Sequence, residues 1–215
     1  MSKQAVIFDL DGVIVSTDEF HYLAWKEISD KENIYFDKSI NERLRGVSRM
    51  ESLEIILKKA NKVYSTEEKE LLTSWKNEVY RRLLDNLSPE DILPGVLILL
   101  KELQEQNVRI AIGSSSKNAR FILDKIKLAN HFDAIADGNS IQKSKPNPEV
   151  FLLAARQLGI DPHACVVVED AEAGIDAGLT AGMKTVGVGS ASLYSKAHIR
   201  VEDLVNLNIL KMLED

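Results

Sequence analysis

The stretch Ala5-Val6-Ile7-Phe8-Asp9-Leu10-Asp11-Gly12-Val13 is the most informative part of this sequence. Its apolar run predicts a buried strand of a parallel sheet, and the run ends on two acids. Residues two apart on a strand point to the same side, so Asp9 and Asp11 are aimed at one place. Open α/β sheets bind ligands at this carboxyl end of their strands, and Gly12 allows a sharp turn there. The stretch therefore predicts a site, although a strand that simply ends in a polar turn would show the same pattern.

The composition is that of an ordinary globular protein. The chain has 215 residues, 45% hydrophobic and 28% charged, which suffices for one sizeable core and a small second lobe. A net charge of −6 argues against a nucleic-acid partner, because nucleic-acid-binding surfaces are basic. Cys165 lies in an apolar run and is expected to be a buried, inert thiol. No signal-like segment opens the chain and no apolar run reaches membrane-spanning length, so we expect a cytoplasmic protein without a membrane partner.

Residues 18–87 have helical periodicity and show no clear strand. Apolar residues recur at helical spacing in three stretches, and the first stretch follows Thr17, a candidate N-cap. The third stretch begins at Thr66 and carries acids in its first turn, as helix starts do. We expect residues 17–89 to form an all-helical domain, inserted into a core domain made of residues 1–16 and 90–215.

Helices and strands alternate through the rest of the chain. The expected strands cover residues 108–112, 132–136, 166–168 and 185–188. The expected helices cover residues 96–103, 117–126, 148–158, 171–179 and 202–213. This alternation predicts an α/β fold with a doubly wound, Rossmann-like parallel sheet, to which the first strand also belongs.

Polar residues follow the later strands of this sheet. The segment Ser114-Ser115-Ser116-Lys117-Asn118 could bind an anion through hydroxyls and backbone N–H groups, although a polar helix cap has the same composition. Lys145 precedes a proline and should lie in an extended segment, where a solvated surface charge is the ordinary interpretation. Glu169 and Asp170 could equally be a helix cap with first-turn charge. Because every one of these residues follows a strand of one sheet, we expect them to gather into one site.

The residue types at this site suit phosphoryl transfer. Asp9, Glu169 and Asp170 would crowd like charges together, which disfavours their ionisation unless a cation is bound. Mg²⁺ prefers carboxylate and phosphate oxygens and is therefore the expected cofactor. Asp9 could attack phosphorus in line and form an aspartyl phosphate, with Asp11 as general acid and base. Lys145 would stabilise the charge on the transferring group.

The order Asp-x-Asp, Ser, Lys-Pro and Glu-Asp resembles the four motifs of the haloacid dehalogenase-like phosphotransferases. The stretch Phe8-Asp9-Leu10-Asp11-Gly12-Val13 is similar to the first motif, and the other three follow in order through the core. The resemblance implies the same roles as above, with Ser114 beside Lys145 as a phosphate ligand. It also implies that the backbone carbonyl of Asp11 is a metal ligand.

The helical insert resembles the cap of the β-phosphoglucomutases. The matching stretches are Thr17-Asp18-Glu19-Phe20-His21 with Trp25, Asn41-Glu42-Arg43-Leu44-Arg45-Gly46-Val47-Ser48-Arg49, and Lys76-Asn77. The core segments Ser114-Ser115-Ser116-Lys117-Asn118 and Ala134-Ile135-Ala136-Asp137 agree as well. This resemblance implies interconversion of β-D-glucose 1-phosphate and glucose 6-phosphate through β-glucose 1,6-bisphosphate, with the insert acting as a lid.

A mutase that handles a bisphosphate needs a second phosphate site. Arg49, Ser116 and Asn118 are the candidates, because arginine suits phosphate, although a basic loop facing solvent is the ordinary alternative. His21 and Lys76 are expected to contact the sugar or to set a hinge. The residues expected to bind phosphate or substrate are Thr17, His21, Trp25, Gly46, Val47, Ser48, Arg49, Lys76, Ser114, Ser115, Ser116, Asn118 and Lys145.

Two other functions fit part of the sequence. A sugar-phosphate phosphatase would use the same catalytic residues, with water in place of a sugar hydroxyl as the acceptor. A catalytically silent binding protein would not need the whole set of acids and Lys145. The sequence departs from the resemblance at Ser16 and Ser115, which bears on substrate preference. We expect a monomer, because the core is short.

Overall fold

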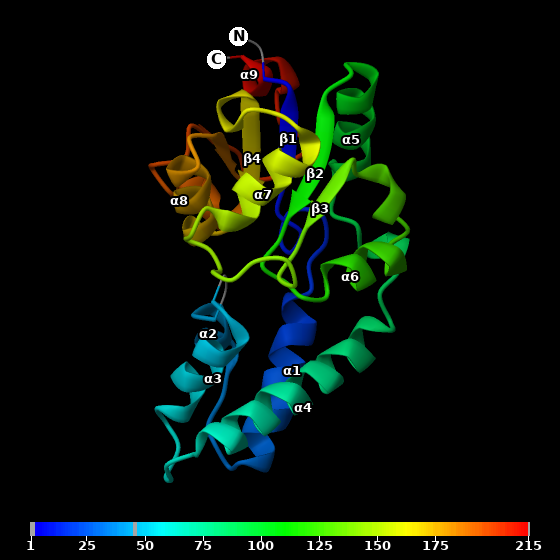
Figure 1. Cartoon of the computed structure of the whole chain (residues 1–215). Coiled ribbons are helices and arrows are strands. Elements are labelled where there is room, and N and C mark those ends of the chain that lie inside the picture. Colours follow the sequence, from blue (N-terminus) through cyan, green and yellow to red (C-terminus); the bar gives the residue numbers. More distant parts are fainter. Residues whose placement is uncertain (1–2, 45–46, 215) are drawn as a thin grey trace. The chain divides into compact units, whose positions relative to one another are not determined.

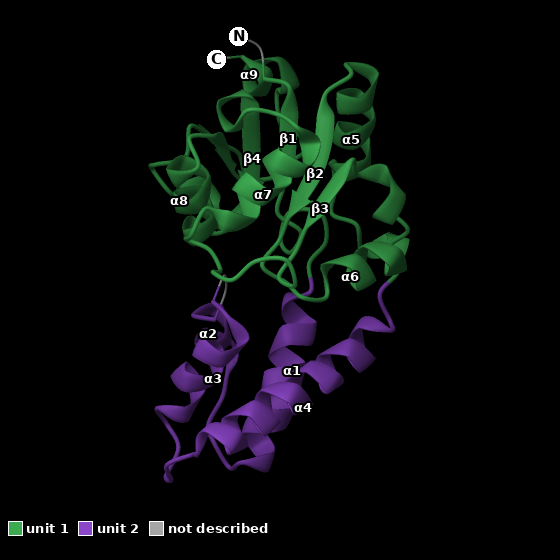
Figure 2. Ribbon diagram, viewed as in Figure 1, with its two compact units in different colours: residues 1–16, 88–215 green, residues 17–87 purple. Residues whose placement is uncertain are grey.

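The computed structural model describes residues 3–44 and 47–214 (Figure 1). The chain divides into two compact units (Figure 2). Unit 1 contains residues 1–16 and 88–215, and unit 2 contains residues 17–87. The sequence-based boundary at residue 89 lies two residues from the division at residue 87. That each unit is a domain in its own right stays a prediction.

Unit 1 is built on a parallel sheet, as the sequence predicts. In the described residues its strands are β1 Ala5–Phe8, β2 Arg109–Gly113, β3 Ala134–Ala136, β4 Cys165–Glu169, β5 Lys184–Gly187 and β6 Ile199–Arg200. They lie in the order β3-β2-β1-β4-β5-β6. The chain adds strands to one side of β1 and then crosses to the other, so β1 and β4 flank the topological switch point. Ligands of open α/β sheets bind there. The sequence did not predict β6, because two residues carry no periodicity.

The remaining elements of unit 1 are helical. They are α5 Val96–Glu105, α6 Ala119–Lys125, α7 Glu149–Leu158, α8 Glu172–Thr180 and α9 Ile209–Leu213, with short 3₁₀ turns at Pro89–Asp91, Ala129–His131, Pro162–Ala164 and Gly189–Leu193. The prediction of a helix over residues 202–213 is wrong in its first half. Asn208 caps α9 by accepting a hydrogen bond from the Lys211 N–H, and the Asp203 carboxylate accepts from the Val205 N–H in a separate turn. These side chains satisfy backbone groups that a longer helix would have used.

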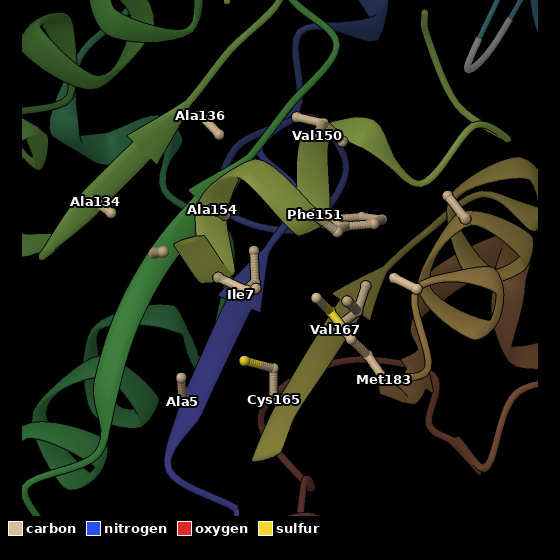
Figure 3. Packing of buried hydrophobic residues seen from close by; sticks show 14 residues of the cluster. Ala5, Ile7, Ala134, Ala136, Val150, Phe151, Ala154, Cys165, Val167 and Met183 are labelled. Atoms are coloured by element: carbon tan, nitrogen blue, oxygen red, sulfur yellow. The ribbon is translucent and has the colours of Figure 1, made fainter. Parts of the chain in front are cut away.

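The core of unit 1 lies between the sheet and the helices α7 and α8 (Figure 3). Ile7 of β1, Val167 of β4 and Phe151 of α7 belong to one buried cluster. The alternate residues of β1, Val6 and Phe8, are also fully buried, so β1 is covered on both faces. A strand buried on both faces reads as an unbroken apolar run, which is why the sequence located β1 correctly. Cys165 is buried in this core, as predicted, and burial raises its pKa to about 11.

Unit 2 is helical throughout its described elements. Its helices are α1 Asp18–Lys31, α2 Lys38–Glu42, α3 Arg49–Leu57 and α4 Thr66–Leu84. Capping boxes begin α3 and α4, at Ser48 with Glu51 and at Ser65 with Glu68. The apolar faces of all four helices meet in one buried cluster. No helix among the described residues of either unit is long and apolar enough to cross a bilayer.

Candidate active site

The carboxyl ends of β1 and β4 bring Asp9 and Glu169 together. Phe8 pairs with Ile112 of β2 and Val168 of β4, so the next residue, Asp9, is level with Gly113 and Glu169. The Asp9 N–H extends the ladder by donating to the Val168 carbonyl at 2.9 Å. Both acids are buried, with exposed fractions of 7% for Asp9 and 2% for Glu169. Two carboxylates therefore lie side by side at the switch point.

The Lys145 ammonium neutralises part of this negative charge. Its Nζ donates to Asp9 Oδ1 and, at 2.8 Å, to Glu169 Oε2. The ammonium also lies 4.6 Å from the ring centre of Phe151. Burial alone lowers the pKa of Lys145, but the charges of Asp9 and Glu169 and their hydrogen bonds outweigh it and hold this pKa above its usual value. Burial, followed by the charge of Asp9, raises the pKa of Glu169.

A carboxylate fixes the loop that carries Lys145. Glu149, the first residue of α7, accepts hydrogen bonds from the N–H groups of Gln142 at 3.0 Å and Lys143 at 2.9 Å. These bonds lower the pKa of Glu149. Lys145 lies in a turn, so the extended segment expected around it is wrong. Its bond to Pro146 is cis. The expectation that Lys145 lies outside a helix is confirmed.

Gly12 allows the chain to turn directly after the first strand. Its N–H donates to the Val15 carbonyl at 2.8 Å, and its φ of +82° is one that glycine adopts readily. A Cβ at this position would lie 2.1 Å from Oδ2 of Asp170. The turn that carries Asp11 therefore approaches Asp170 closely. The role of the Asp11 carboxylate as acid and base, and of its carbonyl as a metal ligand, stay predictions.

Three carboxylates at this site could hold a cation. Asp9, Glu169 and Asp170 each offer an oxygen, and these oxygens lie within 4.8 Å of one another in the described structure. An all-oxygen donor set of this kind suits a hard divalent cation. The residues present therefore fit Mg²⁺, the expected cofactor.

The loop after β2 supplies hydroxyls beside this group. Ser114 Oγ accepts from the Ser116 N–H at 3.1 Å, and Ser116 Oγ accepts from the Asn118 N–H at 3.2 Å. Gly138 lets the loop after β3 pack against it, because a Cβ there would lie 2.3 Å from the Ser115 carbonyl oxygen. The Ser115 hydroxyl is buried and has no hydrogen-bond partner among the described residues. Ser114 follows the strand next to β1, which places it on the same edge of the sheet as Asp9.

Unit 2 holds a second group of predicted residues. Lys76 of α4 is buried, and its Nζ lies 2.8 Å from His21 Nδ1 of α1. Its ammonium also lies 4.4 Å from the ring centre of Tyr80 and 5.2 Å from that of Trp25. Burial, then the charges of Lys76 and Arg49, lower the pKa of His21 well below 6.5. Neutral His21 therefore accepts the hydrogen bond from Lys76, and Trp25 combines core packing with a cation contact.

Other predicted residues of unit 2 have contacts that the sequence did not indicate. Thr17 directly precedes α1, but its hydroxyl does not cap the helix and lies 2.8 Å from the Tyr80 hydroxyl instead. Arg49 Nη2 donates to Asn77 Oδ1 at 2.8 Å. The Ser48 hydroxyl accepts from the Glu51 N–H in the capping box of α3, and Val47 is half-buried. Gly46 lies outside the described residues.

Sequence reasoning missed three residues that support these groups. Glu149 fixes the Lys145 loop, Phe151 lies beneath the Lys145 ammonium, and Tyr80 contacts Lys76. Phe151 and Tyr80 look like ordinary core positions, because an apolar face predicts burial and not the polar group above it. The acid at the start of α7 was the one available signal, since first-turn acids often accept backbone hydrogen bonds.

The parallel sheet with acids and a lysine at its carboxyl edge is typical of phosphotransferases, and the similarity to known proteins places this chain in that class. The chain matches the haloacid dehalogenase-like hydrolase family over residues 6–188 and belongs to that family. It is 46% identical to β-phosphoglucomutase of Bacillus subtilis over 208 residues, covering 96% of this chain and 92% of the relative. A solved β-phosphoglucomutase from Clostridium difficile is 41% identical, with a TM-score of 0.90 over 97% of this chain and 95% of that one. Fructose-1-phosphate phosphatase of Escherichia coli is 32% identical over 184 residues, covering 85% of this chain and 95% of that protein.

Proposed function

We propose that this enzyme interconverts β-D-glucose 1-phosphate and glucose 6-phosphate through β-glucose 1,6-bisphosphate. The observation that carries the proposal is the buried group formed by Asp9, Glu169 and Lys145 at the switch point of the sheet. The similarity to two β-phosphoglucomutases over nearly the whole chain supports the choice of substrate. The expected cytoplasmic location and monomeric state stay predictions.

The reaction begins from enzyme that carries a phosphoryl group on Asp9. The C6 hydroxyl of β-glucose 1-phosphate attacks phosphorus, the bond from phosphorus to the Asp9 oxygen breaks, and Asp11 takes the hydroxyl proton. The bisphosphate then turns end for end. Asp9 attacks the phosphorus at C1, the bond from that phosphorus to the C1 oxygen breaks, and Asp11 returns the proton to this oxygen. Glucose 6-phosphate leaves, and the phosphoenzyme is restored.

Other residues of unit 1 bind and orient the transferring group. Lys145 and the Ser114 hydroxyl would hold the phosphoryl oxygens, and Asp9, Glu169, Asp170 and the Asp11 carbonyl would hold Mg²⁺. When bound, Mg²⁺ would offset the negative charge of phosphate. In this structure Lys145 already contacts the Asp9 carboxylate, so it lies where a phosphoryl group on Asp9 would need a cation.

The cationic residues of unit 2 support a mutase over a hydrolase. Lys76 and Arg49 lie on helices of one bundle, and both have neutral hydrogen-bond partners, His21 and Asn77. A guanidinium held by an amide stays charged and can still bind phosphate through its other N–H groups. We propose that Arg49, Ser116 and Asn118 are the ligands of the phosphate that is not reacting.

A sugar-phosphate phosphatase is the second candidate function. It is favoured by the similarity to the fructose-1-phosphate phosphatase of Escherichia coli over 85% of this chain. Such an enzyme would use Asp9 in the same way, but water would attack the aspartyl phosphate and release inorganic phosphate.

One assay separates the two functions. Purified protein is supplied with Mg²⁺, β-glucose 1-phosphate and a trace of β-glucose 1,6-bisphosphate, and glucose 6-phosphate and free phosphate are followed together. The proposal expects glucose 6-phosphate from the β anomer with little free phosphate, and none from the α anomer. Free phosphate without isomerisation would establish the phosphatase instead.

A further inference from the structure

The Glu169 side chain lies in space that exists because residue 174 is a glycine. Gly174 is the third residue of α8, and it is buried. A Cβ built on it would lie 2.1 Å from Glu169 Cδ, 2.2 Å from Oε2 and 2.3 Å from Cγ. Its three nearest neighbours would therefore all be atoms of Glu169. Contacts this short are sterically impossible, so an alanine at position 174 must displace either the helix or the carboxylate.

Glu169 cannot move aside without losing its partners. Its Oε2 accepts from Lys145 Nζ at 2.8 Å, and its Oε1 accepts from the Ala171 N–H at 3.1 Å. Its side chain is only 2% exposed, so water cannot replace these bonds in the present arrangement. A shift of the carboxylate would leave charged groups buried without their hydrogen bonds, which is costly.

The backbone of α8 gives no other reason for a glycine at this position. Gly174 lies within the helix, and its φ is not in the left-handed region that favours glycine. Glycine within a helix is less favourable than alanine by about 1 kcal/mol. The chain thus carries a residue that weakens α8 at a position where the Glu169 side chain packs against the helix.

We propose that Gly174 is a positioning residue that holds the Glu169 carboxylate in place for Lys145 and for the divalent cation. The part that concerns the cation rests on the divalent-cation site of the proposed function, and not on the choice of substrate. The steric part concerns the metal-free protein and stands apart from it. Gly174 acts by leaving room, so its role depends entirely on the side chain at position 169.

Thermal unfolding of the metal-free protein tests the steric part. The set comprises the wild type, Gly174→Ala, Glu169→Ala and the double variant. Gly174→Ala should lower the Tm of the wild type. In the Glu169→Ala background the same change should raise the Tm by about 2–4 °C, because the helix then gains alanine without a clash. A Tm loss of equal size in both backgrounds would overturn the proposal.

Gly178 of the same helix supplies a matched control. A Cβ there would lie 2.9 Å from Thr185 Cγ2 and 3.3 Å from Val167 Cβ, away from the carboxylates. Gly178→Ala should therefore lower the Tm equally with and without the Glu169 side chain. It separates general crowding of α8 from displacement of Glu169.

Calorimetric titration with Mg²⁺ tests the positioning part. Gly174→Ala should weaken Mg²⁺ binding by about 10–100-fold, the range for losing a group that orients a metal ligand. Gly178→Ala should bind Mg²⁺ as the wild type does. Unchanged Mg²⁺ affinity in Gly174→Ala would overturn the positioning role. If the wild type binds Mg²⁺ but does not isomerise β-glucose 1-phosphate, the proposed function fails while this inference stands.

Discussion

Replacing Lys145 by methionine tests how the buried charges of the site are balanced. Methionine keeps most of the side-chain volume and its contact with Phe151, but it removes the ammonium. Asp9 and Glu169 both lose a hydrogen-bonded cation. The substitution therefore separates the effect of charge from the effect of packing. Its effect on stability can be measured without any substrate.

The burial of the three side chains sets the size of the effect. The exposed fractions are 4% for the Lys145 side chain, 10% for that of Asp9 and 2% for that of Glu169. Removing one partner of a buried ion pair costs about 3–5 kcal/mol, because the other charge is left without compensation. For a chain of this length, that loss lowers Tm by about 6–20 °C. Mg²⁺ would then raise the Tm of the variant more than that of the wild type, since it supplies the missing positive charge.

Thermal unfolding in EDTA and in excess Mg²⁺ measures both effects. Lys101→Met is the matched control, because the Lys101 side chain is 76% exposed and its Nζ lies 3.8 Å from Glu105 Oε1. An exposed pair of this kind contributes at most about 1 kcal/mol. If Lys145→Met loses no more stability in EDTA than Lys101→Met, the ammonium does not balance the two carboxylates and the electrostatic reasoning is wrong.

Four further predictions concern chemistry and pH. Asp9→Asn should abolish phosphoryl transfer and keep the fold, as measured by phosphoenzyme formation and circular dichroism; retained turnover would exclude Asp9 as the nucleophile. Asp11→Ala should slow transfer by about 10²–10⁴-fold in single-turnover assays, and an ordinary rate would assign acid–base catalysis to another group. Arg49→Ala should weaken binding of β-glucose 1,6-bisphosphate by about 2–5 kcal/mol. Asn77→Ala keeps the guanidinium and should lose less affinity. If Arg49→Ala binds the bisphosphate as tightly as the wild type does, Arg49 does not contact a phosphate. Burial lowers the pKa of His21 below 6.5, so the unfolded chain binds this proton first on acidification. The contribution of His21 to stability should therefore fall as pH drops through about 6.5, by up to about 1.4 kcal/mol per pH unit, against the opposite contribution of Glu169, whose pKa burial raises. His21→Asn should remove that slope in urea unfolding, and the two proteins should show parallel pH dependence at higher pH; the same slope in both would contradict a neutral His21.

Local sequence patterns predicted most of the fold because they report burial on each element. The run from Ala5 to Phe8 is buried on both faces, so it reads as an unbroken apolar strand. The prediction failed near residue 202, where we expected a helix to begin. There Asp203 and Asn208 accept backbone hydrogen bonds in turns, and these compete with a continuous helix.

The candidate site was predictable in its members but only partly in its contacts. Asp9 and Glu169 were expected together because the carboxyl ends of neighbouring parallel strands meet at one edge of a sheet. Thr17 was expected to cap α1, and its hydroxyl instead contacts Tyr80, which lies 63 residues further along the chain. Such a pairing depends on how two helices pack, and no local pattern records it.

The amino-acid sequence alone was enough to predict the parallel α/β core, the helical insert and the acids and lysine that follow the strands. It could do so because strand periodicity and turn residues act over a few neighbouring positions. Three features became known from the folded chain: Lys145 contacts both Asp9 and Glu169, Lys76 contacts His21, and Gly174 leaves room for Glu169. These contacts join residues on different elements, so they depend on strand register, helix packing and excluded volume, which exist only once the chain has folded.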